Sequence, residues 1–114
     1  MPRILVVEDD AALRLFIQHV LLYAGYEVDT TGTMSGGSDL VRCRRYDLVI
    51  SDVKLPDGNG LEIADLAGEK GTKALMITGY AFTLPTGTHE RYEFLLKPVR
   101  ATEILAAVER ALTD

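Results

Sequence analysis

The chain has 114 residues, 47% of them hydrophobic, and a formal net charge of −5 at pH 7. This length allows one hydrophobic core, so we expect a single domain over residues 1–114 without a separate output domain. The acidic charge argues against direct nucleic-acid binding, which needs a positive surface. The single cysteine, Cys43, excludes an internal disulfide, and no apolar run is long enough for a signal peptide or membrane span. A cytoplasmic location is therefore expected.

Short apolar runs alternate with helical patterns along the chain. The predicted strands are Arg3–Val7, Glu27–Thr30, Leu48–Asp52, Lys73–Thr78 and Tyr92–Leu96. The first predicted helix ends at Gly25 and buries Leu13, Phe16, Ile17, Val20 and Leu21 on one face; the others are Met34–Arg45, Leu61–Ala67 and Ala101–Leu112. The segment Tyr80–Arg91 has a composition closer to a loop, so the fourth helix is predicted to be short or missing.

This alternation predicts an α/β fold, a doubly wound parallel sheet of five strands with helices on both faces. Right-handed crossovers and the flavodoxin-like order 2-1-3-4-5 bring the carboxyl ends of strands one, three, four and five together. The residues at those ends are Glu8 and Asp9, Asp52, Thr78 and Lys97.

Asp52 is the leading candidate for a functional residue. The continuous apolar run Leu48–Ile50 before it suits a central strand that is buried on both faces. The stretch Pro56–Gly60 after it predicts a tight loop and no further strand. Open α/β sheets place ligand chemistry at this edge, although a lone strand-end aspartate often only caps a turn. Asp10 is expected to be such a cap, at the start of the first helix.

The residues at the predicted edge have complementary chemistry. Carboxylates from Glu8, Asp9 and Asp52 would repel one another unless a cation lay between them, and oxygen ligands favour Mg²⁺. Lys97 supplies a positive charge and Thr78 a hydroxyl donor. A nucleophile, a metal, a cation and a donor are what phosphoryl transfer to a carboxylate requires.

Four motifs in order resemble the receiver domain of bacterial two-component response regulators, over essentially the whole chain. They are Ile4–Asp10, Leu48–Asp52 with Pro56 and Gly60, Met76–Gly79, and Lys97-Pro98. The resemblance implies that Asp52 is phosphorylated, that Asp9, Asp52 and the Lys54 backbone carbonyl bind Mg²⁺ directly, that Glu8 acts through water, and that Thr78 and Phe94 form the switch.

The resemblance also implies a signalling role rather than an enzyme. The expected partners are a histidine kinase or histidine phosphotransfer protein and a downstream protein target, with the chain a monomer or weak dimer. The output surface is expected over Gly79–Arg100, with Tyr80–Arg91 mobile before phosphorylation. The side chains of Lys54 and Tyr80 are expected to border the phosphoryl group and slow its hydrolysis.

The same residues bear on three other functions. A haloacid-dehalogenase-type phosphatase needs a second acid two residues after its nucleophile, where this chain has Lys54. A flavin carrier needs a phosphate-binding loop after the first strand, where Glu8, Asp9 and Asp10 would repel phosphate. A receiver-like adaptor that is never phosphorylated remains the main alternative, and it predicts gaps in the site that the sequence does not have.

Overall fold

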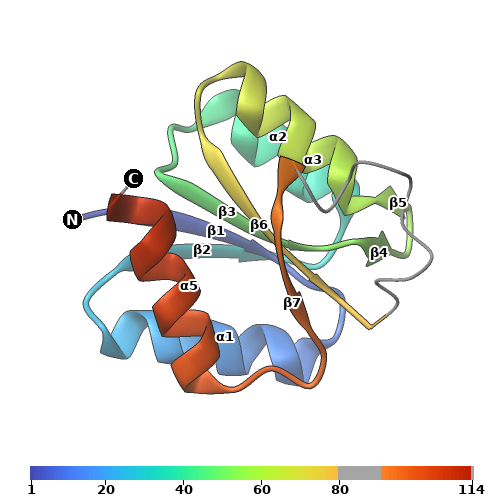
Figure 1. Cartoon of the computed structure of the whole chain (residues 1–114). Helices are drawn as coiled ribbons and strands as arrows, with labels where there is room; N and C mark the ends of the chain where they lie inside the picture. Colours follow the sequence, from blue (N-terminus) through green and yellow to red (C-terminus); the bar gives the residue numbers. More distant parts are fainter. Residues whose placement is uncertain (80–90, 114) are drawn as a thin grey trace.

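The computed structural model describes residues 1–79 and 91–113, and a parallel sheet forms its centre (Figure 1). The sheet order is β2-β1-β3-β6-β7, which is the predicted order 2-1-3-4-5 of a flavodoxin-like fold. Its strands are β1 (Arg3–Val7), β2 (Glu27–Thr31), β3 (Leu48–Asp52), β6 (Lys73–Thr78) and β7 (Glu93–Leu96), all paired in parallel.

Helices cover both faces of the sheet, as Figure 1 shows. Helices α1 (Ala11–Tyr23) and α5 (Ala101–Thr113) lie on one face, and α2 (Met34–Cys43) and α3 (Gly60–Glu69) lie on the other. In the described part of the chain, no helix is long and apolar enough to cross a membrane. The predicted loss of a fourth helix concerns residues 80–90, which lie outside the described residues.

The two faces of the sheet pack against separate hydrophobic clusters, because successive side chains of a strand point to opposite sides. Along β1, Ile4 and Val6 pack with α1 and α5, whereas Leu5 and Val7 pack with α2 and α3. Every residue of β3 is buried. This double burial confirms the expectation drawn from the continuous apolar run, and it fixes the strand that ends at Asp52.

Gly36 and Gly37 have low helix propensity at the start of α2, but close contacts with neighbouring side chains leave no room for a larger residue at either position. A Cβ at Gly37 would lie 2.8 Å from Ile63 Cδ1 and 2.9 Å from Val7 Cγ2, so the helix could not pack this closely on the sheet and on α3 with a larger residue. A Cβ at Gly36 would lie 2.3 Å from Thr31 Oγ1. The helix tolerates both glycines because tertiary packing outweighs the propensity cost of about 1 kcal/mol each.

Two predicted details of the helices are wrong. Phe16 is 40% exposed, because the buried face of α1 is centred on Ile17 and Leu21 and the preceding residue lies about 100° away around the helix. Helix α2 ends at Cys43, so the last two residues of the predicted helix are outside it. Helix α5 begins after Arg100, whose backbone N–H donates to the Glu103 carboxylate at 3.0 Å, which is half of a capping box.

The sequence after β3 was predicted to form a loop with no further strand, and this prediction is wrong. Strands β4 (Lys54–Leu55) and β5 (Gly58–Asn59) form a short antiparallel hairpin. Pro56 is compatible with this hairpin because it lies in the turn, where no backbone N–H is needed for pairing.

Candidate functional site

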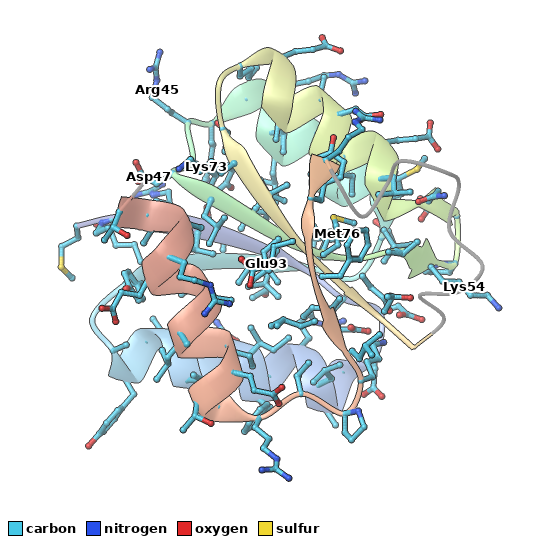
Figure 2. All side chains as sticks on the ribbon, in the orientation of Figure 1. Arg45, Asp47, Lys54, Lys73, Met76 and Glu93 are labelled. Carbon is cyan, nitrogen blue, oxygen red and sulfur yellow. The ribbon has the colours of Figure 1, made fainter. Side chains whose placement is uncertain are left out.

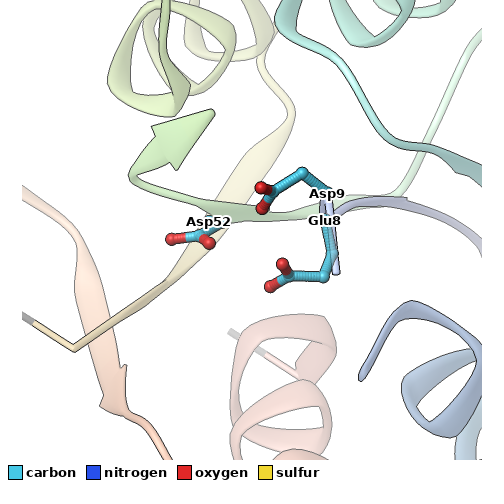
Figure 3. A group of neighbouring side chains, drawn as sticks. All are labelled: Glu8, Asp9 and Asp52. Atoms are coloured by element: carbon cyan, nitrogen blue, oxygen red, sulfur yellow. The ribbon is translucent and has the colours of Figure 1, made fainter. Parts of the chain in front are cut away.

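Three carboxylates meet at the carboxyl edge of the sheet, and Figure 3 shows Glu8 and Asp9 following β1 opposite Asp52 at the end of β3. Val7 is in register with Ser51, so Glu8 lies level with Asp52 on the neighbouring strand. One carboxylate oxygen from each acid lies within 4.8 Å of the others. Glu8 and Asp52 are buried, whereas Asp9 is exposed. The parallel topology therefore brings together the acids that the sequence indicated.

Lys97 joins this cluster from the end of β7. Its Nζ donates to Asp52 Oδ2 at 2.7 Å and forms an ion pair with Glu8 Oε1 at 3.3 Å. The backbone N–H of Lys97 donates to the Thr78 carbonyl at 3.0 Å, which continues the β6–β7 ladder to this point. A cavity of about 530 Å³ opens here, lined by Asp9, Asp10, Asp52, Lys54, Leu55, Pro56, Gly79 and Lys97.

Burial dominates the electrostatics of Glu8, which is only 1% exposed. The pKa of Glu8 is raised to about 7, with desolvation as the largest cause and the nearby Asp52 charge acting in the same direction. This value already includes the opposing effects of the Asp10 backbone N–H, which donates to Glu8 Oε2 at 3.0 Å, and of the Lys97 ammonium. Partial burial opposes the charge on Lys97, but its hydrogen bond and attraction to Asp52 raise its pKa overall.

The donor set fits a divalent cation. Glu8 Oε1 is buried and accepts no hydrogen bond from the described residues, although buried polar oxygens almost always do. Lys97 supplies one positive charge to three neighbouring carboxylates. Oxygen ligands of this kind, with room for water, are those that Mg²⁺ prefers. The acidic cluster is therefore consistent with a magnesium site.

The β4–β5 hairpin forms the side of the site next to Asp52. The Lys54 backbone N–H donates to Asp52 Oδ1 at 3.2 Å, while its exposed side chain points away from the sheet (Figure 2). Gly60 closes the hairpin and donates its N–H to the Val53 carbonyl at 2.7 Å. A Cβ at Gly60 would lie 1.9 Å from the Asp52 carbonyl oxygen, so only glycine allows α3 to begin this close to the site.

Thr78 and Phe94 lie on the neighbouring strands. Ile77 is in register with Asp52, so the buried Thr78 follows one residue beyond it at the end of β6. Phe94 is in register with Met76 and packs against the small core formed by Val53, Ala64 and Met76. Tyr80, the other residue expected to border the site, lies outside the described residues.

Sequence reasoning missed two residues that hold the site in place. Arg14 reaches back from α1 and donates from Nη1 to the Glu8 carbonyl at 2.8 Å. Ser51 is fully buried and donates from its hydroxyl to the Asp52 carbonyl at 2.8 Å. Helix α1 contains no lysine, aspartate or glutamate, and Arg14 is its only arginine. This isolated charge was a signal in the sequence that Arg14 has a specific partner. The sequence around Ser51 offers no comparable signal, because a small residue suits any buried strand.

The described structure is therefore a doubly wound parallel sheet with an acidic cluster and a lysine at its carboxyl edge. The chain matches the family model of the response regulator receiver domain over residues 4–109. It therefore belongs to the receiver domain family of two-component response regulators.

Solved structures and curated relatives agree with this family. The response regulator TrrA from Thermotoga maritima, solved in complex with Mg²⁺-BeF, is 30% identical with a TM-score of 0.86, covering 98% of this chain and 100% of that one. The chemotaxis response regulator CheY4 of Vibrio cholerae is also 30% identical, with a TM-score of 0.85, covering 98% of this chain and 99% of that one.

The curated relatives are longer than this chain. The two-component response regulator ORR24 of Oryza sativa is 36% identical over 108 residues, which are 90% of this chain and 17% of the relative. The response regulator ArlR of Staphylococcus aureus is 33% identical over 116 residues, which are 98% of this chain and 53% of the relative. The similarity to these relatives thus concerns only part of their length.

Proposed function

We propose that Asp52 accepts a phosphoryl group from a phosphohistidine of a histidine kinase or histidine phosphotransfer protein. The observation that carries the proposal is the position of its carboxylate, which is buried, contacts Lys97 and opens onto a cavity beside Glu8 and Asp9. In the transfer, a new bond forms between an Asp52 oxygen and phosphorus. The bond between phosphorus and the histidine nitrogen breaks, and its electron pair stays on the nitrogen.

The surrounding residues position the reacting groups and balance their charge. Lys97 holds Asp52 Oδ2 and faces the cavity, where its ammonium is close enough to attract a phosphoryl oxygen. The Lys54 backbone N–H holds Asp52 Oδ1, so both carboxylate oxygens have a fixed direction. The Thr78 hydroxyl is assigned to a further phosphoryl oxygen. Most of the catalysis in such a transfer is positioning and neutralisation of charge.

Magnesium is the proposed cofactor. Asp9, Asp52 and the backbone carbonyl of Lys54 would hold the ion directly, and Glu8 would contact it through water. The bound ion supplies positive charge to the oxygens of the carboxylates and the phosphoryl group. Glu8 Oε1, which accepts no hydrogen bond from the described residues, and the structural similarity to a protein solved with Mg²⁺-BeF support this assignment.

Phosphorylation is proposed to change a protein-binding surface over Gly79–Arg100 that a downstream target recognises. Thr78 and Lys97 lie at the ends of β6 and β7, so contacts to a phosphoryl group reach both strands that border this surface. Phe94 has no hydroxyl and responds by packing alone. The adaptor that is never phosphorylated is less favoured, because no residue of the acceptor site is missing.

The test is phosphorylation of the purified protein by acetyl phosphate with Mg²⁺, followed by intact-mass analysis and peptide mapping. One phosphoryl group on Asp52 is expected, and none in Asp52→Asn or when EDTA removes the metal. Asp39→Asn changes an exposed acid of α2 and serves as the matched control, with full labelling expected. Equal labelling of Asp52→Asn would overturn the assignment, and absence of labelling in the wild type would favour the adaptor.

A further inference from the structure

The hairpin that carries Lys54 is too small to hold its own position. It contains two residue pairs, Lys54 with Asn59 and Leu55 with Gly58. A hairpin of this size is at best marginally stable in water, so other contacts must fix it. Asn59 provides one, since its side chain caps α3 by accepting from the Leu61 N–H at 2.8 Å.

A second and stronger contact joins the hairpin turn to α2. Asp57 Oδ1 accepts from the Met34 N–H at 2.7 Å, and Oδ2 accepts from the Ser35 N–H at 3.0 Å. These are the first amides of α2, which have no partner within the helix. The N-cap residue Thr33 serves a different amide, that of Gly36, at 3.0 Å. The Asp57 carboxylate therefore binds two amides of α2, one with each oxygen, and neither is the amide that the N-cap residue Thr33 binds.

Charge and packing strengthen the same contact. The amide hydrogen bonds from Ser35 and Met34 lower the pKa of Asp57, and a carboxylate is also favoured at the positive N-terminal end of a helix. Beside it, Gly58 lies against the Met34 side chain, where a Cβ would be only 2.3 Å from Sδ. The hairpin turn and the first residue of α2 thus fit together through both polar and apolar contacts.

We propose that Asp57 is a positioning residue for the metal site, because it fastens the hairpin that carries the Lys54 carbonyl to the N-terminus of α2. The proposal rests on the function proposed above and adds to it a dependence of metal affinity on α2. Asp57 does not line the cavity beside Asp52, whereas Lys54, Leu55 and Pro56 do. Its effect is therefore transmitted along the hairpin backbone rather than by contact with the ion.

Affinity for Mg²⁺ and for beryllofluoride in the presence of Mg²⁺ should distinguish this role from simple helix capping. In Asp57→Ala we expect both affinities to fall about tenfold, the lower range for residues that orient metal ligands. Asp57→Asn keeps one acceptor oxygen and should fall in between. Asp39→Ala removes the same charge from α2 without touching the hairpin, and it should bind both ligands as the wild type does.

Titrations followed by NMR, with ¹⁹F signals for bound beryllofluoride, give these affinities, and urea unfolding in EDTA gives the stability separately. A loss of stability in Asp57→Ala with unchanged affinities would overturn the proposal and leave Asp57 as a helix cap. Equal losses in Asp39→Ala and Asp57→Ala would also overturn it, since charge alone would explain both. If the wild type itself bound neither ligand, the proposed function would fail, which is a distinguishable result.

Discussion

Replacing Glu8 by glutamine should stabilise the metal-free protein at pH 8 and have a much smaller effect near pH 5. Glu8 is 1% exposed, and burial raises its pKa from 4.5 to about 7. Because the pKa is higher in the folded state, folding is linked to proton uptake by this carboxyl. Its contribution to stability is fully present below pH 4.5 and is lost as the pH rises through 7.

The magnitude follows from the two pKa values. A change from 4.5 to about 7 corresponds to about 3 kcal/mol of lost stability once the pH exceeds both. Glutamine has nearly the same shape and no charge, and Lys97 keeps its partner Asp52 in the variant. We therefore expect the free energy of unfolding of Glu8→Gln, relative to wild type, to rise by about 2 kcal/mol between pH 5 and pH 8.

Urea unfolding in EDTA at several values between pH 5 and pH 8 measures this difference. Glu109→Gln, a change of the same kind at an exposed position of α5, is the control and should show no such trend. A gap between Glu8→Gln and wild type that stays constant with pH would refute the reasoning. Adding Mg²⁺ at pH 8 should stabilise the wild type more than the variant, because the ion supplies the charge that the buried carboxylate lacks.

Three further predictions concern the edge of the site. Gly60→Ala should lower the free energy of unfolding by at least about 2 kcal/mol, because the new Cβ would collide with the Asp52 carbonyl at the end of β3. Gly68→Ala is the control: a Cβ there would have no atom within 4 Å, so in the same urea assay it should raise the free energy of unfolding by up to about 1 kcal/mol. Lys54→Ala should speed loss of the phosphoryl group, measured by the decay of labelled protein, because Lys54 lines the cavity beside Asp52, and an unchanged decay rate would remove its side chain from the account. Thr78→Ala should reduce the NMR shift changes that beryllofluoride causes at the ring of Phe94, and unreduced changes would remove Thr78 from the switch.

The sheet was predictable because its signals are local. The apolar runs Ile4–Val7 and Leu48–Ile50 are short, continuous and bounded by polar residues, which is what strands buried on both faces require. Once the strands are known, the parallel topology decides which strand ends meet. That is why Lys97, far from Asp52 in the sequence, could be expected beside it, and the two are 2.7 Å apart.

The details that were missed depend on contacts between distant segments. Phe16 fits the helical pattern as well as Ile17 does, and only the packing of α1 on the sheet decides which of them is buried. The hairpin after β3 is not evident from Pro56 and its neighbouring glycines, because two residue pairs leave almost no periodic signal. The sequence around Arg14 marks it as unusual in its helix, but only the fold shows that its partner is the Glu8 carbonyl.

The two sides of the site are supported in different ways. Glu8 follows β1 and Asp52 is the last residue of β3, and both strands lie inside the sheet with neighbouring strands on both sides. Lys54 lies in a hairpin that is held by the caps of Asp57 on α2 and Asn59 on α3. Substitutions in the central strands, other than those of Asp52 itself, should therefore act mainly on stability. Substitutions in the hairpin act on the position of the Lys54 carbonyl, so they should change metal affinity more than they change stability.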